Sequence, residues 1–135
     1  MINIYLIMNS PKLFKITKKD IAKYQLLIDK IDLKQKTTII EVLGLKIQKI
    51  LDDGNLNILE IKLIEDMASL VQILEFNQNL PKKVIKMVLF AMSYFIDEND
   101  EIPDIIPEYG YLDDITVVSW VMEEIQQIIP EITRA

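Results

Sequence analysis

Apolar residues recur at helical spacing along most of the chain, and polar breaks divide them into five predicted helices. The first helix follows Thr17, which together with Asp20 three residues later is typical of a helix N-cap. The second covers about residues 33–51 and ends in an Asp-Asp-Gly-Asn run, where Gly54 suits the left-handed cap position. Its wide apolar stripe predicts burial on more than one side. The stripe consists of Ile39, Ile40, Val42, Leu43, Leu45, Ile47, Ile50 and Leu51.

A polar break separates the third helix from the fourth. Asn57 with Glu60 marks the start of the third helix, which is predicted to end near residues 77–79. Pro81 is predicted at the first position of the fourth helix, where proline is accepted. The apolar positions of the first, third and fourth helices are Ile21, Tyr24, Leu27, Ile28, Ile31, Leu59, Leu63, Met67, Leu70, Val71, Leu74, Val84, Ile85, Val88, Leu89, Met92, Phe95 and Ile96.

The fifth helix is predicted to begin at a cap formed by Asp113 or Asp114 and to stop before Pro130. Between the fourth and fifth helices, residues 98–111 lack helical rhythm because two prolines prevent a regular helix. Three isoleucines in this segment predict that it folds back onto the bundle and is rigid. The apolar positions of the fifth helix are Ile115, Val118, Val121, Met122, Ile125 and Ile128.

These features predict an all-α fold, a compact bundle of about five helices with a rigid, proline-containing acidic loop between the last two. Residues 1–135 are expected to form a single domain with a short N-terminal segment at residues 1–16, and the true start is left open between Met1 and Met8. The first residues lack the basic region and cleavage site of a secretory signal. The longest uncharged helical run, residues 87–96, is too short to span a bilayer. We therefore expect no transmembrane segment and a cytoplasmic location, with attachment to a membrane surface as an alternative.

The amino-acid composition excludes several classes of catalytic and metal-binding site. The 135 residues include no Cys, no His and only 3 Gly. These absences exclude a disulfide framework, a Cys nucleophile, a Ser-His-Asp triad and a zinc site of His or Cys ligands. The three glycines are also too far apart for a phosphate-binding loop. We therefore predict a non-enzymatic protein that needs no cofactor.

The formal net charge of −6 is unevenly distributed. Residues 1–86 hold 14 lysines and 10 acidic residues, whereas residues 87–135 hold one arginine and 11 acidic residues. The extremes are residues 12–36, with eight lysines, and residues 97–114, with eight carboxylates and no base. Such asymmetry steers partners of opposite charge, although both runs can equally be solvated faces. A net acidic chain with one arginine is a poor candidate for nucleic-acid binding.

The acidic loop contains two kinds of candidate site. Its aspartates are oxygen ligands of the type that hard cations prefer, namely Asp97, Asp100, Asp104, Asp113 and Asp114. The alternative is that these residues cap the last helix and hold turns. A contact surface for a protein is predicted at Glu98, Glu101, Glu108, Tyr109 and Tyr111, because tyrosine is enriched at interface hot spots. The alternative is that the two tyrosines pack over neighbouring helices. Paired carboxylates also serve hydrolases, but this region has no His or Arg to hold an anionic transition state.

The same segment resembles the signature of the YkvA-like family, a short bacterial domain of unknown function. The matching positions are Asp100, Ile102, Pro103, Asp104, Ile106, Pro107, Gly110, Leu112, Asp113 and Asp114. The resemblance covers about residues 84–125, and it departs from the family pattern where Glu98 and Asn99 replace Ser-Pro and Glu101 replaces an apolar residue. It implies a helix, a rigid turn and a second helix, and it carries no assigned reaction.

Three functions are left open at this point. The leading hypothesis is an interaction or adaptor module that uses residues 97–114 to bind a basic protein partner. The alternative is a peripheral membrane module, in which residues 12–36 lie on anionic lipid with Leu13 and Phe14 at the interface. The second alternative is a divalent-cation site or hydrolase in the acidic loop. The apolar face of the second helix is either core or the surface of a homodimer.

Overall fold

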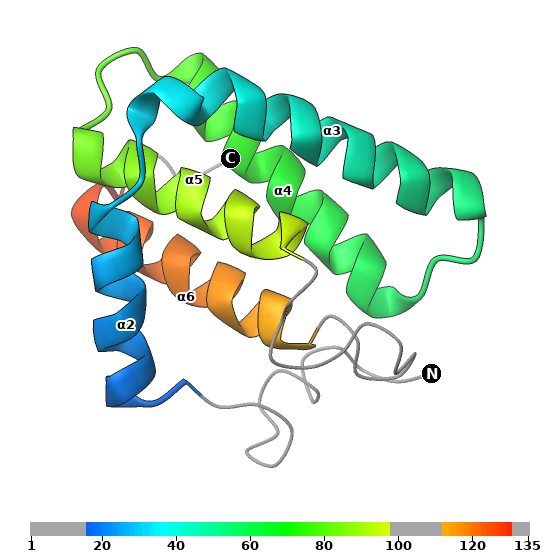
Figure 1. Ribbon diagram of the computed structural model, residues 1–135, viewed down its shortest axis with the longest axis horizontal. Helices are drawn as coiled ribbons and strands as arrows, with labels where there is room; N and C mark the ends of the chain where they lie inside the picture. Colours follow the sequence, from blue (N-terminus) through cyan, green and yellow to red (C-terminus); the bar gives the residue numbers. More distant parts are fainter. Residues whose placement is uncertain (1–15, 98–111, 131–135) are drawn as a thin grey trace.

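Five α-helices and one short 3-10 helix make up most of the residues described by the computed structural model, which are 16–97 and 112–130 (Figure 1). For residues 112 and 113 only the backbone is described. Helices account for 83% of the described residues and no strand occurs among them, which confirms the all-α prediction. In chain order the elements are α2 (Lys18–Asp29), η1 (Leu33–Gln35), α3 (Lys36–Asp53), α4 (Ile58–Phe76), α5 (Lys82–Ile96) and α6 (Leu112–Ile128).

The predicted caps of three helices are confirmed by the local hydrogen bonds. At the start of α2, the Thr17 hydroxyl accepts from the Asp20 N–H at 3.1 Å, and the Asp20 carboxylate accepts from the Thr17 N–H at 3.0 Å. Asn57 and Glu60 form the same reciprocal pair at the start of α4, at 2.8 and 3.1 Å. At the end of α3, Gly54 has a φ of 80°, a left-handed conformation that glycine adopts without steric cost.

Three predicted helix starts differ from the structure. The second helix begins as the 3-10 turn η1, capped by the Asp32 carboxylate, and becomes regular only at Lys36. Pro81 lies one residue before α5, because its ψ of 143° is extended. Neither Asp113 nor Asp114 is a cap, since α6 already begins at Leu112. An aspartate is also stabilised inside the first helical turn by the helix dipole, so its residue type alone does not locate the cap.

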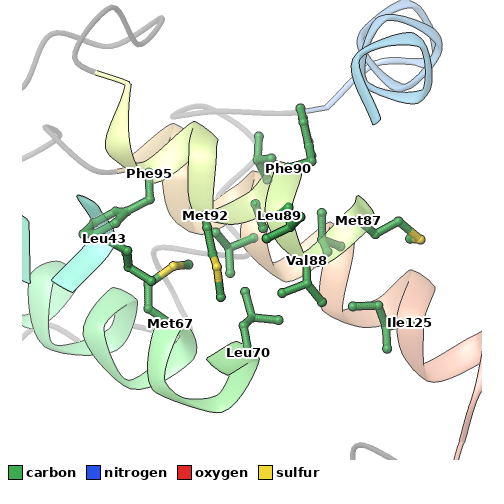
Figure 2. Close-up of a cluster of buried hydrophobic side chains, with 14 of the residues drawn as sticks. Leu43, Met67, Leu70, Met87, Val88, Leu89, Phe90, Met92, Phe95 and Ile125 are labelled. Atoms are coloured by element: carbon green, nitrogen blue, oxygen red, sulfur yellow. The ribbon is translucent and has the colours of Figure 1, made fainter. Parts of the chain in front are cut away.

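Helix α5 is the centre of the core. It contacts α2, α3, α4 and α6, and the six consecutive residues 87–92 in its middle are all buried, whereas Lys82 and Lys83 at its start are exposed. Figure 2 shows these side chains together with Leu43 of α3, Met67 and Leu70 of α4, and Ile125 of α6. The buried residues of α5 are Val84, Met87, Val88, Leu89, Phe90, Ala91, Met92 and Phe95.

The expectation that α3 is buried on more than one side is wrong. Within this helix only Leu43 and Ile50 are buried. Three other residues of its apolar stripe, Val42, Leu45 and Leu51, are 39%, 72% and 44% exposed. The reason is the position of α3 at the edge of the bundle, where its principal helical neighbour is α5 (Figure 1).

Two further predicted core residues lie at the surface. Leu27 in α2 and Ile128 in α6 are both exposed. Tyr24 and Ile28 already fill the side of α2 that meets the core, so Leu27 falls just beyond the contact. Ile128 is the last residue of α6 and is 43% exposed.

An aromatic cluster joins α2 to α5 and α6. Tyr24 is buried, and its ring centroid lies 5.6 Å from that of Phe90, 6.0 Å from that of Tyr94 and 5.8 Å from that of Trp120. Tilted and edge-on pairs at these distances add a favourable quadrupole interaction to the burial of the rings. A hydrogen bond also joins α5 to α2, because the Lys86 ammonium donates to the Asp29 carbonyl oxygen at 3.2 Å.

Substitutions at the two glycines that the structure describes are expected to have opposite effects on stability. Nothing lies within 4 Å of the position that a Cβ would occupy at Gly44, in the middle of α3. Gly44→Ala is therefore expected to raise the free energy of unfolding by about 0.5–1 kcal/mol, because alanine loses less backbone entropy in a helix. Gly54→Ala is expected to lower it by roughly 1 kcal/mol, because alanine is strained at positive φ. Urea unfolding of both variants measures the signs, and a Gly44→Ala variant less stable than the natural chain would contradict the exposed position.

Candidate functional site

The acidic segment, residues 97–114, connects α5 to α6, and the structure describes its two ends. Asp97 is exposed and caps the C-terminus of α5, where its N–H donates to the Ser93 carbonyl oxygen at 2.9 Å. Asp114 is fully buried in the first turn of α6. A carboxylate in that position is stabilised by the partial positive charge of the helix N-terminus. The segment therefore leaves the bundle at an exposed carboxylate and returns at a buried one.

Most of the predicted site residues lie outside the described residues. These are Glu98, Asp100, Glu101, Asp104, Glu108, Tyr109 and Tyr111, together with the side chain of Asp113. The contact surface and the cation site therefore stay predictions. In the parts of the chain that are described, no three acidic residues come together in a way that could hold a metal ion.

The end of α5 that leads into the acidic segment is held by α3. The Lys46 ammonium donates a hydrogen bond to the Phe95 carbonyl oxygen and lies 4.6 Å from the centroid of the Phe95 ring. A cation at this place compensates the partial negative charge of the helix C-terminus, and it also interacts with the face of the ring. Because the Phe95 side chain is itself buried, the backbone just before Asp97 is fixed from both sides.

A second buried carboxylate, Asp66 of α4, was not predicted from the sequence. Its Oδ1 atom forms an ion pair of 2.6 Å with the Lys62 ammonium one turn earlier. Its Oδ2 atom is buried, and no described residue donates a hydrogen bond to it. A buried acceptor without a donor loses its hydration and gains nothing in return, which destabilises the charged form.

The electrostatics of Asp66 follow from this burial. Desolvation raises the pKa of the Asp66 carboxyl above its ordinary value of 3.8, while the hydrogen bond and the charge of Lys62 lower it by less. The negative charge of the neighbouring Glu65 raises the pKa slightly further. The helical register contains a signal for this residue, because Asp66 lies three positions after buried Leu63 and four before buried Leu70.

The outer face of α2 combines lysines with exposed leucines. Leu26 and Leu27 are 62% and 41% exposed, although both are large apolar side chains. Around them on the same side of the helix lie the exposed residues Lys19, Lys23 and Lys30, at positions separated by three or four residues. Of the predicted membrane-contacting segment, Leu13 and Phe14 lie outside the described residues. Among the helices of the described chain, none has the length and apolarity needed to cross a bilayer.

The fold and the described ends of the segment define a class of helical bundle. In this class a central apolar helix, α5, is joined by an acidic segment to a second core helix, α6. Residues 84–120 match the model of a family described as a protein of unknown function, DUF1232. This match confirms the resemblance to a short domain of unknown function, for which YkvA-like is a consistent name. It covers α5, the acidic segment and the first half of α6, which is less than a third of the chain. Neither a curated protein nor a solved structure matches the chain.

The burial of Asp66 predicts that this residue destabilises the folded chain less as the pH falls. The folded chain holds the Asp66 proton more tightly than the unfolded chain, because burial raises the pKa of this group. Its penalty to stability is therefore present above the raised pKa and is lost as the pH falls toward 3.8. The free energy of unfolding of the natural chain should rise relative to that of the Asp66→Asn variant between pH 7 and about pH 4. Denaturant unfolding across this range measures the difference, with the exposed-site variant Glu75→Gln as a control, and a constant difference would contradict the assignment.

Proposed function

We propose that this protein is a non-enzymatic interaction module whose acidic segment, residues 97–114, binds a basic surface of a protein partner. The observation that carries the proposal is the concentration of eight carboxylates and no base in a segment that joins two helices of the core. Like charges at this density repel one another, and a cationic partner relieves that repulsion. The family match covers parts of α5 and α6 and assigns no activity to them.

The fixed ends of the segment support binding rather than a passive linker. Asp97 follows a helix end that Lys46 and the buried Phe95 side chain hold in place, and Asp114 is buried on the other side. Holding both ends reduces the conformational freedom that the segment would lose on binding. Charges presented in this way increase the rate of encounter with a basic partner, and salt weakens their effect.

Neutralising the segment tests the proposal. The tagged variant carrying Asp97→Asn, Glu98→Gln, Glu101→Gln and Glu108→Gln is expected to lose a partner that the natural chain captures from its own cells. The loss should be matched by elution of the natural complex when ionic strength rises from about 0.1 to 0.5 M, because screening shortens the reach of the charges. The measurement is quantitative mass spectrometry of the captured proteins.

A matched variant separates local charge from net charge. Asp53→Asn, Glu65→Gln, Glu75→Gln and Glu123→Gln remove the same number of exposed carboxylates from α3, α4 and α6. This control is expected to keep the partner. Equal retention by both variants would contradict binding through the acidic segment, and equal loss would attribute it to overall charge.

The outer face of α2 favours a second candidate function, attachment to an anionic membrane surface. Exposed Leu26 and Leu27 among lysines form the pattern of a helix that lies at a lipid interface. The surrounding charges are mixed, since Asp20 and Asp29 belong to the same helix.

Vesicle flotation tests this second candidate. The natural chain is expected to float with vesicles that contain about 30% phosphatidylserine and to remain behind with pure phosphatidylcholine, because each basic residue near an anionic surface contributes about 1 kcal/mol. The variant Leu26→Gln, Leu27→Gln should float several-fold less while keeping its helical circular dichroism. Flotation that ignores either the anionic lipid or the two leucines would contradict attachment through α2.

A further inference from the structure

The outward side of α3 carries an apolar residue that no described helix covers. Leu45 is 72% exposed at the middle of the helix, and Val42 one turn earlier is 39% exposed. Removing an exposed leucine from water is favourable, so a partner that covers Leu45 gains a central apolar contact. We call the row formed by Glu41, Leu45 and Lys49 the α3 ridge, because residues four apart line up along a helix surface.

The charges of the α3 ridge are arranged symmetrically about Leu45. Glu41 lies four residues before it and Lys49 four residues after it, so the two opposite charges are equally far from the leucine. Both side chains are exposed, and neither forms an ion pair with another described residue. A second α3 that runs in the opposite direction places its Lys49 beside Glu41 and its Glu41 beside Lys49. The ridge is therefore complementary to itself, which is the requirement for a two-fold symmetric contact.

Gly44 provides the space for such a contact. Its Cβ position has no neighbour within 4 Å, so nothing in the described fold requires glycine there. A glycine in the middle of an exposed helix is nevertheless unfavourable relative to alanine. Gly44 is next to Leu45 in the sequence and three residues after Glu41, so a leucine from a facing helix would meet no side chain at this position.

We propose that two copies of this chain associate through α3, with the helices antiparallel and crossing at the α3 ridge. When rows of residues four apart pack side by side, helices cross at about 50°, the commonest class of helix packing in globular proteins. In this geometry the two Leu45 side chains lie next to each other over the two Gly44 residues. Two ion pairs, each between Glu41 of one copy and Lys49 of the other, flank them.

The contact is small and therefore weak. Helices that cross at a steep angle meet over about two turns, so the buried area lies at the low end for specific interfaces. The dimer is accordingly expected to form at high protein concentration and to dissociate on dilution. The proposal is independent of the acidic segment and of α2, since neither contributes a residue to the contact.

Sedimentation equilibrium with charge-reversal variants tests the proposal. The natural chain should show reversible, concentration-dependent dimerisation. Glu41→Lys alone and Lys49→Glu alone should each weaken dimerisation by roughly tenfold, because each converts two attractive pairs into two repulsive ones. The double variant Glu41→Lys, Lys49→Glu should restore dimerisation to within about threefold, since it exchanges the two charges. A monomer at every concentration, or a double variant as weak as the singles, would overturn the proposal.

A variant at Gly44 separates association from folding. Gly44→Gln should raise the melting temperature, because glutamine favours the helix and meets no atom of the fold. The same variant should weaken dimerisation at least tenfold, because its side chain fills the place that Leu45 of the second copy occupies. A more stable Gly44→Gln variant that still dimerises like the natural chain would overturn the antiparallel geometry.

Discussion

The whole structure depends on the burial of the middle of α5, where residues 87–92 are all buried. A helix with an unbroken run of apolar residues, such as residues 87–92 of α5, is unstable in water and must be covered by other elements. Here α2, α3, α4 and α6 each cover part of it. The positions of these four helices therefore follow from one constraint, and contacts such as the aromatic cluster at Tyr24 determine where on α5 each helix lies. The exposed faces of α2 and α3 result from the same constraint, because a helix at the edge is needed only on the side that meets α5.

Much of this fold was predictable from the sequence because its signals are local. The caps at Thr17, Asn57 and Gly54 depend on hydrogen bonds and backbone angles within a few residues, and all three were identified. The apolar spacing likewise located every described α-helix. What periodicity does not contain is the number of neighbours that a helix has. The apolar stripe of α3 is as wide as that of a central helix, yet Leu45 lies at the surface, because width alone does not show which side meets the core.

The candidate site was less predictable, for a related reason. Sequence reasoning counted carboxylates and treated those of the acidic segment alike, whereas Asp97 is exposed and Asp114 is buried. It missed Asp66, since a charged residue in an apolar stripe is normally assigned to the solvent side. Whether a carboxylate is desolvated depends on the helices packed around it, which tertiary structure decides. Charge density can thus be calculated from composition, but the environment of each charge cannot.

The extent of the family match has a consequence for other chains that contain the same segment. Residues 84–120 include α5 but only one of the four helices that cover it, α6. The described helical parts of this segment therefore lie in the core, and most of the helices that cover them belong to sequence beyond the match. A chain that carries this segment without equivalents of α2, α3 and α4 must cover the central helix by other means, with lipid, with another protein or with a repeated copy of itself. The same sequence signature is therefore compatible with proteins whose central helix is covered by lipid, by another protein or by a second copy of the segment.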